Sequence, residues 1–173
     1  MKAGTVAQVV LAASALAAAT GGIMGQTQVG RPTVASMDSA IKAVFAEINT
    51  PYQARKDSDG STTFVYTVGS VTGQLYEFLG EDGKVESLKL NVGYDVEKAP
   101  PLAAINSFNE KRRFGKAFLD ADGDPFLVSD LDVQFGINNG ALKAWIVRFR
   151  AIVPLFELEV IKEGKSSDAQ RSP

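Results

Sequence analysis

The stretch Asn106-Ser-Phe-Asn-Glu-Lys-Arg-Arg-Phe-Gly-Lys-Ala-Phe-Leu-Asp-Ala-Asp-Gly-Asp-Pro125 contains three structural signals in succession. Residues up to Arg113 have the apolar spacing of the end of an amphipathic helix. Residues 114–119 follow as a short strand, and residues 120–125 form an acidic turn that opens a second strand, because Asp-Gly pairs favour tight turns. The stretch therefore predicts a helix followed by a β-hairpin.

The residues before this stretch predict a helix followed by an antiparallel meander. A helix is expected over residues 36–49, with Ser36 as its cap, because apolar residues recur there at helical spacing. The period then changes to two, which predicts strands at residues 62–68, 74–79 and 85–94. The pair Asp82-Gly83 supplies the turn between the last two strands.

The residues after this stretch predict a strand over residues 126–135 and a last helix that starts at Asn138 or Asn139. Trp145 and Phe149 belong to the apolar face of that helix, and Pro154 is expected to kink it. The predicted order is α-β-β-β-α-β-β-α. The chain is thus expected to form an α+β domain over residues 36–161, with helices packed on one face of an antiparallel sheet.

The two ends of the chain have a different character from the domain. Residues 1–19 have the features of a signal peptide: Lys2, an apolar run, and alanines placed for cleavage before Thr20. An uncleaved membrane anchor is the alternative, although the run is short and rich in alanine. Residues 20–35 are expected to be a flexible spacer and residues 162–173 a disordered tail. The protein is therefore expected to be periplasmic or secreted, with no stable membrane insertion after cleavage.

The composition argues against most catalytic chemistry. The chain has no His and no Cys, which supply most nucleophilic, near-neutral acid–base and transition-metal chemistry in proteins. The formal net charge of −2 gives no field that would attract nucleic acid. We therefore expect no cofactor, no metal and no nucleic-acid partner, and a binding function in place of an enzymatic one.

Two acidic clusters leave alternatives open. Asp120, Asp122 and Asp124 suggest calcium, but their spacing departs from an EF-hand, and a hairpin turn explains the same residues. Asp130 and Asp132 lie on one face of the next strand. A carboxylate pair is the catalytic arrangement of glycoside hydrolases, and the alternation of a half-exposed strand also explains the two residues. A periplasmic ligand binder or hydrolase using residues 120–132 remains the alternative function.

The same central segment resembles the YbjN family of bacterial proteins. The residues that carry the resemblance are Phe108-Asn109, Arg113-Phe114, Ala117-Phe-Leu-Asp120, Asp122-Gly-Asp124 and Leu131-Asp132, followed by a helix with Trp145 and Phe149. The resemblance covers about residues 37–161.

The resemblance implies a type III secretion chaperone-like fold, a role as a regulator of sensory transduction, and no enzyme activity. Members of the family often associate as dimers, so a protein partner and a homodimer are expected. The candidate partner-binding residues are the polar ones in and beside the motif: Asn109, Arg112, Arg113, Asp120, Asp122 and Asp124. Export separates this chain from the cytoplasmic secretion chaperones, so a chaperone role for secreted effectors is not expected.

Overall fold

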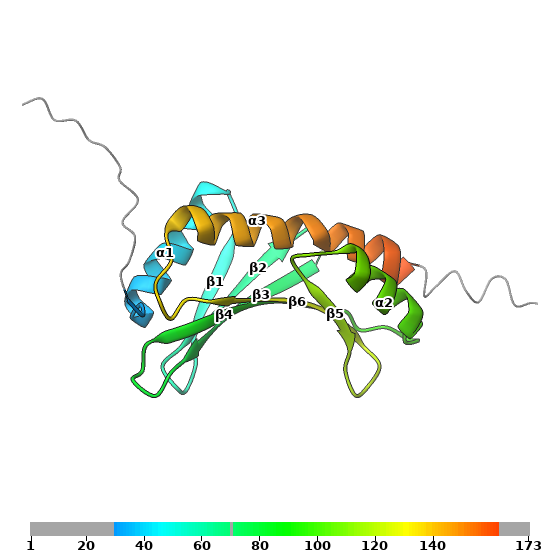
Figure 1. Ribbon diagram of the computed structural model, residues 1–173, viewed down its shortest axis with the longest axis horizontal. Coiled ribbons are helices and arrows are strands. Elements are labelled where there is room, and N and C mark those ends of the chain that lie inside the picture. The colour runs from blue at the N-terminus through cyan, green and yellow to red at the C-terminus, as the bar shows by residue number, and fades with distance from the viewer. Residues whose placement is uncertain (1–29, 70, 163–173) are drawn as a thin grey trace, which may run out of the picture.

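The computed structural model describes residues 30–69 and 71–162, which form one antiparallel sheet with helices on one side (Figure 1). The expected signal peptide and most of the expected tail lie outside the described residues. The elements are α1 Val34–Glu47, β1 Tyr52–Lys56, β2 Thr62–Val68, β3 Val71–Leu79, β4 Val85–Gly93, α2 Leu102–Lys111, β5 Lys116–Leu119, β6 Pro125–Asp132, α3 Asn139–Phe156 and a π-helix, η1, Glu157–Ile161. The α+β class and the predicted order are confirmed, with one strand and one π-helix added.

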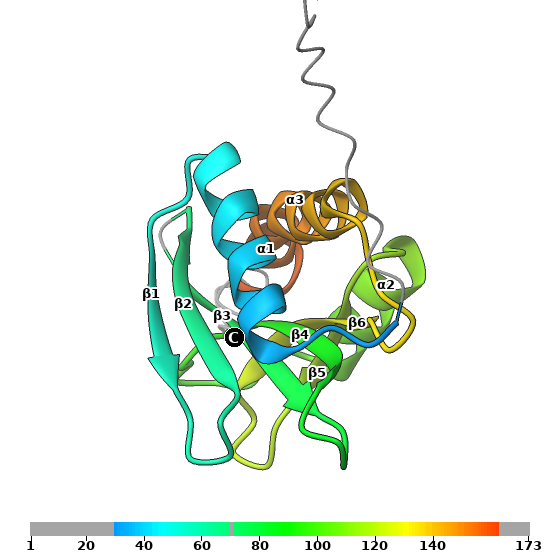
Figure 2. The same cartoon turned by 90° about the vertical axis from the view of Figure 1, so that its left-hand side faces the viewer.

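The six strands form a single sheet in the order β1-β2-β3-β4-β6-β5, and all neighbours are antiparallel. The predicted meander and the predicted hairpin are thus not separate, because β4 pairs with β6 from Gly93↔Phe126 to Ser87↔Asp132. The sheet curls around α1 and α3 (Figure 2). Only two strand edges, those of β1 and β5, lie at the ends of this sheet.

Alternation along the strands directs one set of side chains toward the helices. Phe64, Leu75, Leu90 and Leu127 occupy this face of four successive strands and are fully buried. From α3 the same core receives Leu142, Trp145, Ile146, Phe149, Val153 and Phe156. The predicted core position of Trp145 is confirmed: it is 8% exposed, and its indole Nε1 donates to Ser129 Oγ at 2.9 Å.

Several predicted boundaries move by a few residues. The cap of α1 is Thr33, not Ser36, because the Ser36 N–H donates to Thr33 Oγ1 at 3.2 Å, so the helix begins inside the expected spacer. Asn138 caps α3, since its Oδ1 accepts from the Ala141 N–H at 2.8 Å. The helix is not broken at Pro154; it continues to Phe156 and then changes to the π-helical hydrogen bonding of η1.

One strand escaped prediction. Every residue of β1 is exposed, so the sequence Tyr-Gln-Ala-Arg-Lys has none of the apolar alternation that a half-buried strand shows.

Within the described part of the chain, no helix has the length and the apolar character needed to cross a membrane.

Candidate functional site

Asn109 closes one of the two edges of the sheet. Its Nδ2 donates to the Ala117 carbonyl at 2.9 Å, and its Oδ1 accepts from the Ala117 N–H at 2.7 Å. A side chain of α2 thus takes the place that a further strand would occupy beside β5. Asn109 thus has a structural role at this edge, and its partner-binding role stays a prediction.

Replacing Asn109 by alanine is expected to lower the free energy of unfolding by about 2–3 kcal/mol, because both backbone groups of Ala117 lose their partner. Chemical denaturation of the variant measures this loss. Glu110→Ala, an exposed change in the same helix, is the control and should cost less than about 0.5 kcal/mol. Equal midpoints for the two variants would contradict the edge-closing role.

The two arginines that follow Asn109 belong to the helical layer. Arg112 forms an ion pair with Glu159 and lies 5.6 Å from the centre of the Phe108 ring, so it joins the end of α2 to η1. Arg113 is exposed and lies 5.6 Å from the ring of Phe114. Arg112 is thus occupied within the fold, whereas Arg113 stays accessible to a partner.

The three aspartates between β5 and β6 form the predicted hairpin turn. Asp120 Oδ1 accepts from the N–H groups of Asp122 at 3.0 Å and Asp124 at 2.9 Å. Gly123 has a φ of +88°, a conformation that glycine adopts without strain. Asp124 Oδ1 accepts from the Val96 N–H at 3.1 Å. The hairpin interpretation is confirmed, and the described residues contain no group of three or more acidic side chains arranged to hold a metal ion.

The carboxylates of β6 are exposed and occupied separately. Asp130 lies 3.7 Å from the Lys89 ammonium, on the face of the sheet that carries no helix. Asp132 accepts from the Gln134 N–H at 2.9 Å, which is the main reason why its pKa is lowered. A carboxyl group with a lowered pKa is poorly suited to act as a general acid at neutral pH. This geometry gives no support to a hydrolase built on residues 120–132.

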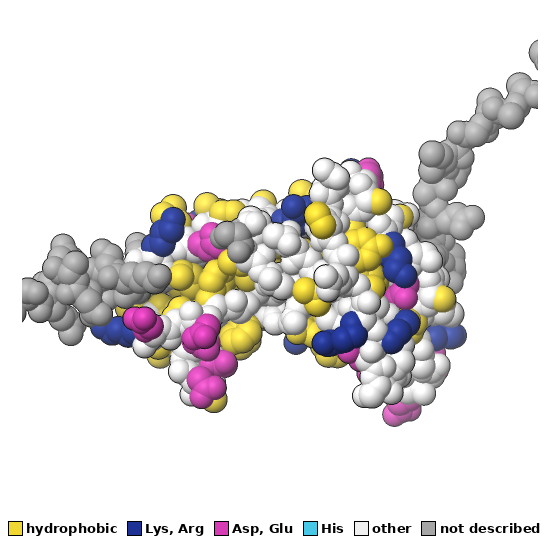
Figure 3. Space-filling view, turned by 180° about the vertical axis from the view of Figure 1, so that it is seen from behind, with side chains coloured by type: hydrophobic (Ala, Val, Ile, Leu, Met, Phe, Trp, Pro, Cys, Tyr) yellow, Lys and Arg dark blue, Asp and Glu magenta, His cyan; other side chains and the backbone are white. Residues whose placement is uncertain are grey.

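The six predicted partner-binding residues do not form one site. Asp120, Asp122 and Asp124 are joined within their turn, and the described contacts link none of them to Asn109, Arg112 or Arg113. The turn forms one of two projections on either side of a hollow beneath the sheet, and acidic side chains gather on it (Figure 3). The other projection, formed by the hairpins at the opposite end of the strands, carries charges of both signs.

The second edge of the sheet, along β1, is open. The Asp57 N–H donates to the Ser61 carbonyl at 3.0 Å and closes the β1–β2 hairpin. Bonded and non-bonded pairs alternate in an antiparallel ladder, so Arg55 and Gln53 bond to β2. Ala54, between them, must direct its N–H and C=O away from β2. Among the described residues no hydrogen bond reaches these two backbone groups.

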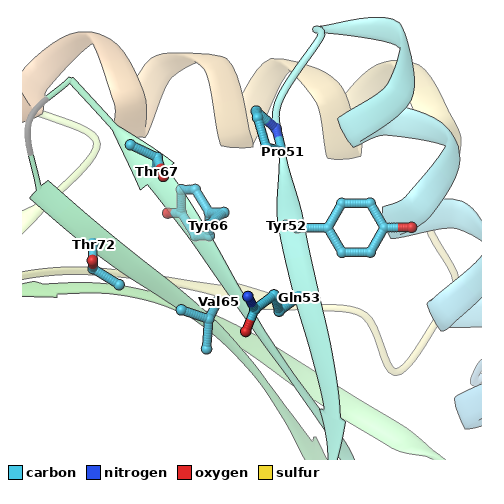
Figure 4. Close-up of a pocket in the computed structure, with 7 residues that line it drawn as sticks. All are labelled: Pro51, Tyr52, Gln53, Val65, Tyr66, Thr67 and Thr72. Atoms are coloured by element: carbon cyan, nitrogen blue, oxygen red, sulfur yellow. The ribbon is translucent and has the colours of Figure 1, made fainter.

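A pocket of about 340 Å³ lies beside this edge. The pocket is lined by residues of β1, β2 and β3 and by the residue before β1: Pro51, Tyr52, Gln53, Val65, Tyr66, Thr67 and Thr72 (Figure 4). Gln53 and Val65 lie next to each other, whereas Tyr52 points to the opposite side of β1. None of the lining residues is charged, so the pocket suits a small apolar or neutral polar side chain.

The cations of β1 are held back from the edge by ion pairs. Arg55 Nε lies 3.3 Å from Asp57 Oδ1. Lys56 Nζ donates to Thr62 Oγ1 at 2.6 Å and to Asp38 Oδ2 at 3.3 Å. Charged side chains that project from an edge strand discourage pairing with another chain. Here the charged side chains of Arg55 and Lys56 pair with aspartates near the β1–β2 hairpin. Residues 51–54 of the same edge carry no charge.

Asp38 is one member of a buried carboxyl pair that the sequence did not reveal. Asp38 on α1 is 8% exposed and Glu77 on β3 is 4% exposed. Burial, and next the negative charge of Asp38, raise the pKa of Glu77 to about 8. Glu77 Oε2 accepts from the Thr62 N–H at 3.1 Å. Asp38 Oδ1 and Glu77 Oε1 are buried and receive no donor from other residues, an arrangement that a proton shared between the two carboxyl groups would satisfy.

One signal in the sequence points to this pair. Glu77 is two residues from Leu75 and two from Leu79, so alternation places it on the core face of β3. A charged residue at such a position needs partners. Its surroundings come from α1, β1 and β2, through Asp38, Lys56 and Thr62, which are at least 15 residues away in sequence, so periodicity does not identify them.

The sequence of the domain matches one known family. A family model described as "Putative bacterial sensory transduction regulator" matches residues 38–161, which extend from the second turn of α1 to the end of η1. This confirms the resemblance inferred from the central segment. A search of curated proteins finds no match.

Proposed function

The chain belongs to the YbjN family, and we propose that it is an exported, non-catalytic interaction domain that acts in regulation by binding another protein. The family description supports a regulatory role. The apolar run and the alanines of residues 1–19 support export to the periplasm or beyond. The absence of His and Cys, together with the separate structural roles of the acidic residues, supports binding over catalysis.

The proposed mode of recognition is the addition of an extended segment of the partner to β1. The observation that carries this proposal is the free N–H and C=O of Ala54 on an edge strand whose five residues are all exposed. Edge strands bind extended peptides through main-chain hydrogen bonds, and neighbouring pockets select side chains. The uncharged pocket at Gln53 and Val65 supplies such selection. At the edge along β5, Asn109 already occupies the outward N–H and C=O of Ala117.

Ala54→Pro tests this mode of binding directly. Proline removes the outward N–H of residue 54 but leaves the β1–β2 hydrogen bonds of Gln53 and Arg55, since edge strands accept proline on their free side. Ala54→Val is the matched control, because it keeps the N–H group. Probe peptides come from a random-peptide display library selected on the purified protein. We expect them to bind wild-type and Ala54→Val alike, and Ala54→Pro at least about 10-fold more weakly, by calorimetry.

Hydrogen exchange supplies a second measurement on the same samples. The Ala54 amide should exchange rapidly in the free protein and slowly in the peptide complex, because a new main-chain hydrogen bond protects it. Peptides that bind Ala54→Pro as well as wild-type would show that β1 is not the recognition edge. A library that yields no binder would argue against peptide recognition altogether.

A further inference from the structure

Arg150 of α3 carries a positive charge that the described part of the chain does not neutralise. Its side chain is half-buried, as are those of Arg31 and Arg112, and each of those two arginines pairs with a carboxylate. The ion pairs among the described residues do not include Arg150. Its Nη1 donates to Thr50 Oγ1. A guanidinium has five N–H donors and stays charged at physiological pH, so Arg150 retains donors for an anion from outside the chain.

The Arg150 guanidinium lies at the end of the pocket where β1 begins. Its acceptor Thr50 immediately precedes Pro51, which lines the pocket together with Tyr66 (Figure 4). Burial raises the pKa of Tyr66, and the positive charge of Arg150 opposes that rise, which places the guanidinium near the Tyr66 hydroxyl. That hydroxyl is buried and has no hydrogen-bond partner among the described residues. This end of the pocket thus combines a charge without a counterion and a hydroxyl without a partner.

The direction of a partner strand on β1 decides which of its ends meets Arg150. An antiparallel strand runs from the β1–β2 hairpin toward Pro51, so its carboxyl end arrives beside Thr50. A parallel strand brings its amino end to the same place. The guanidinium attracts a terminal carboxylate and repels a terminal ammonium. Residue 51 is a proline, so the edge offers no main-chain N–H at that point, and a partner chain that ends there gives up no pairing with it.

We propose that the segment bound along β1 is the carboxyl terminus of a partner protein, antiparallel to β1, with its terminal carboxylate on Arg150. This inference rests on the proposed function, because it requires β1 to be the recognition edge. Guanidinium groups bind carboxylates through paired N–H donors, and capture of a C-terminal carboxylate is an established mode of peptide recognition. A residue opposite Ala54 is followed by about two more before the chain ends, at a rise of about 3.3 Å per residue.

The pocket specifies the side chain that accompanies the carboxylate. Its lining carries no charge and includes Val65, Thr67 and the ring of Tyr66. The volume of about 340 Å³ accommodates one side chain of ordinary size. The terminal residue of the partner is therefore expected to be apolar or neutral, while Arg150 recognises its carboxylate.

Peptides with free and amidated carboxyl termini test this inference on the wild-type protein. The sequences come from a random-peptide display library whose carboxyl termini are free, and each selected peptide is synthesised in both forms. Calorimetry should show that the free acid binds at least about 10-fold more tightly than the amide, because the amide lacks the charge that Arg150 pairs with. Equal binding of the two forms would overturn the inference.

Arg150→Gln identifies the residue that reads the carboxylate. The variant keeps a side-chain N–H donor but loses the charge, so its preference for the free acid should fall below about 2-fold, with little change in its affinity for the amide. Arg148→Gln is the matched control. Arg148 is an exposed arginine of the same helix that lies against the Phe114 ring, so this variant loses the same charge and should discriminate as wild-type does. Equal discrimination by Arg150→Gln and wild-type would also overturn the inference.

Failure of this inference is distinct from failure of the proposed function. Ala54→Pro should weaken binding of the acid and the amide alike, because it removes a main-chain hydrogen bond that both forms make. A second library, with its random segment fused to carrier protein at both ends, separates the cases further. If only this second library yields binders, and Ala54→Pro weakens them, β1 recognises internal segments. The proposed function would then stand, and recognition of a carboxyl terminus would be wrong.

Discussion

Replacing Trp145 by alanine is expected to lower the free energy of unfolding by about 3–5 kcal/mol, the usual cost of truncating a large aromatic side chain in a core. Trp145 is nearly buried between α3 and the sheet, and its indole N–H is bonded to Ser129. The variant loses the packing of the ring and leaves a cavity, and the Ser129 hydroxyl loses its donor. Urea denaturation followed by circular dichroism measures the change.

Phe135→Ala is the control for Trp145→Ala. Phe135 also lies close to β6, but its side chain is 82% exposed, so its removal should change stability by less than about 0.5 kcal/mol. Ser129→Ala separates the two contributions, because it removes the acceptor of the indole N–H and leaves the whole ring in the core. Equal denaturation midpoints for wild-type and Trp145→Ala would show that the indole contributes no packing energy.

Stability is expected to fall as the pH rises from about 5 to about 8, because of Glu77. Its pKa is raised from 4.5 to about 8 in the folded protein, mainly by burial. Between these two values the unfolded chain has released the proton and the folded chain still holds it, so folding is favoured less at each higher pH. The contribution is complete below pH 4.5 and is lost by about pH 8. A loss of about 2–4 kcal/mol over this range is expected.

Glu77→Gln should remove this pH dependence. An amide is the uncharged counterpart of the protonated acid: its oxygen accepts from the Thr62 N–H, as Glu77 Oε2 does, and its NH₂ group donates to Asp38. The variant should match wild-type near pH 5 and exceed its stability at pH 9 by about 2–4 kcal/mol. Thermal or urea unfolding at several pH values is the measurement.

Glu110→Gln serves as the control for this series, since Glu110 is exposed on α2. Removing its charge should change the free energy of unfolding little at any pH. Parallel curves for wild-type and Glu77→Gln would mean that Glu77 is ionised in the fold. In that case Lys56, which bonds to Asp38 and Thr62, would balance two carboxylates, and the shared proton would have to be abandoned.

The element order of the domain was accessible to sequence reasoning because its elements bury one side. Periodicity identifies an element when burial differs between its faces, and this holds for α1, β2, β4 and α3. The turn at residues 120–124 was equally readable, because its hydrogen bonds come from within the turn itself. Boundaries shifted where a cap decides them, as at Thr33, because several nearby residues are able to cap the same helix.

The candidate sites were less accessible because their partners come from distant segments. The β1 edge has no burial pattern of its own, and its freedom depends on which strands end the sheet. The sequence presents Asn109 as a polar surface residue. Its two hydrogen bonds to Ala117, at the other edge of the sheet, appear only in the folded structure. The Asp38–Glu77 pair requires α1 and β3, which are far apart in sequence, to come together.

By itself, then, the sequence determined the α+β class, the central helix–hairpin unit and the lack of His and Cys chemistry, since all three depend on composition or on neighbouring residues. Only the tertiary structure decided that the meander and the hairpin join into one sheet, that β1 forms one edge of that sheet, and that burial raises the pKa of Glu77. The physical reason is that hydrogen bonding across strands and the desolvation of a charge depend on groups far apart in the chain, whose positions no local pattern records.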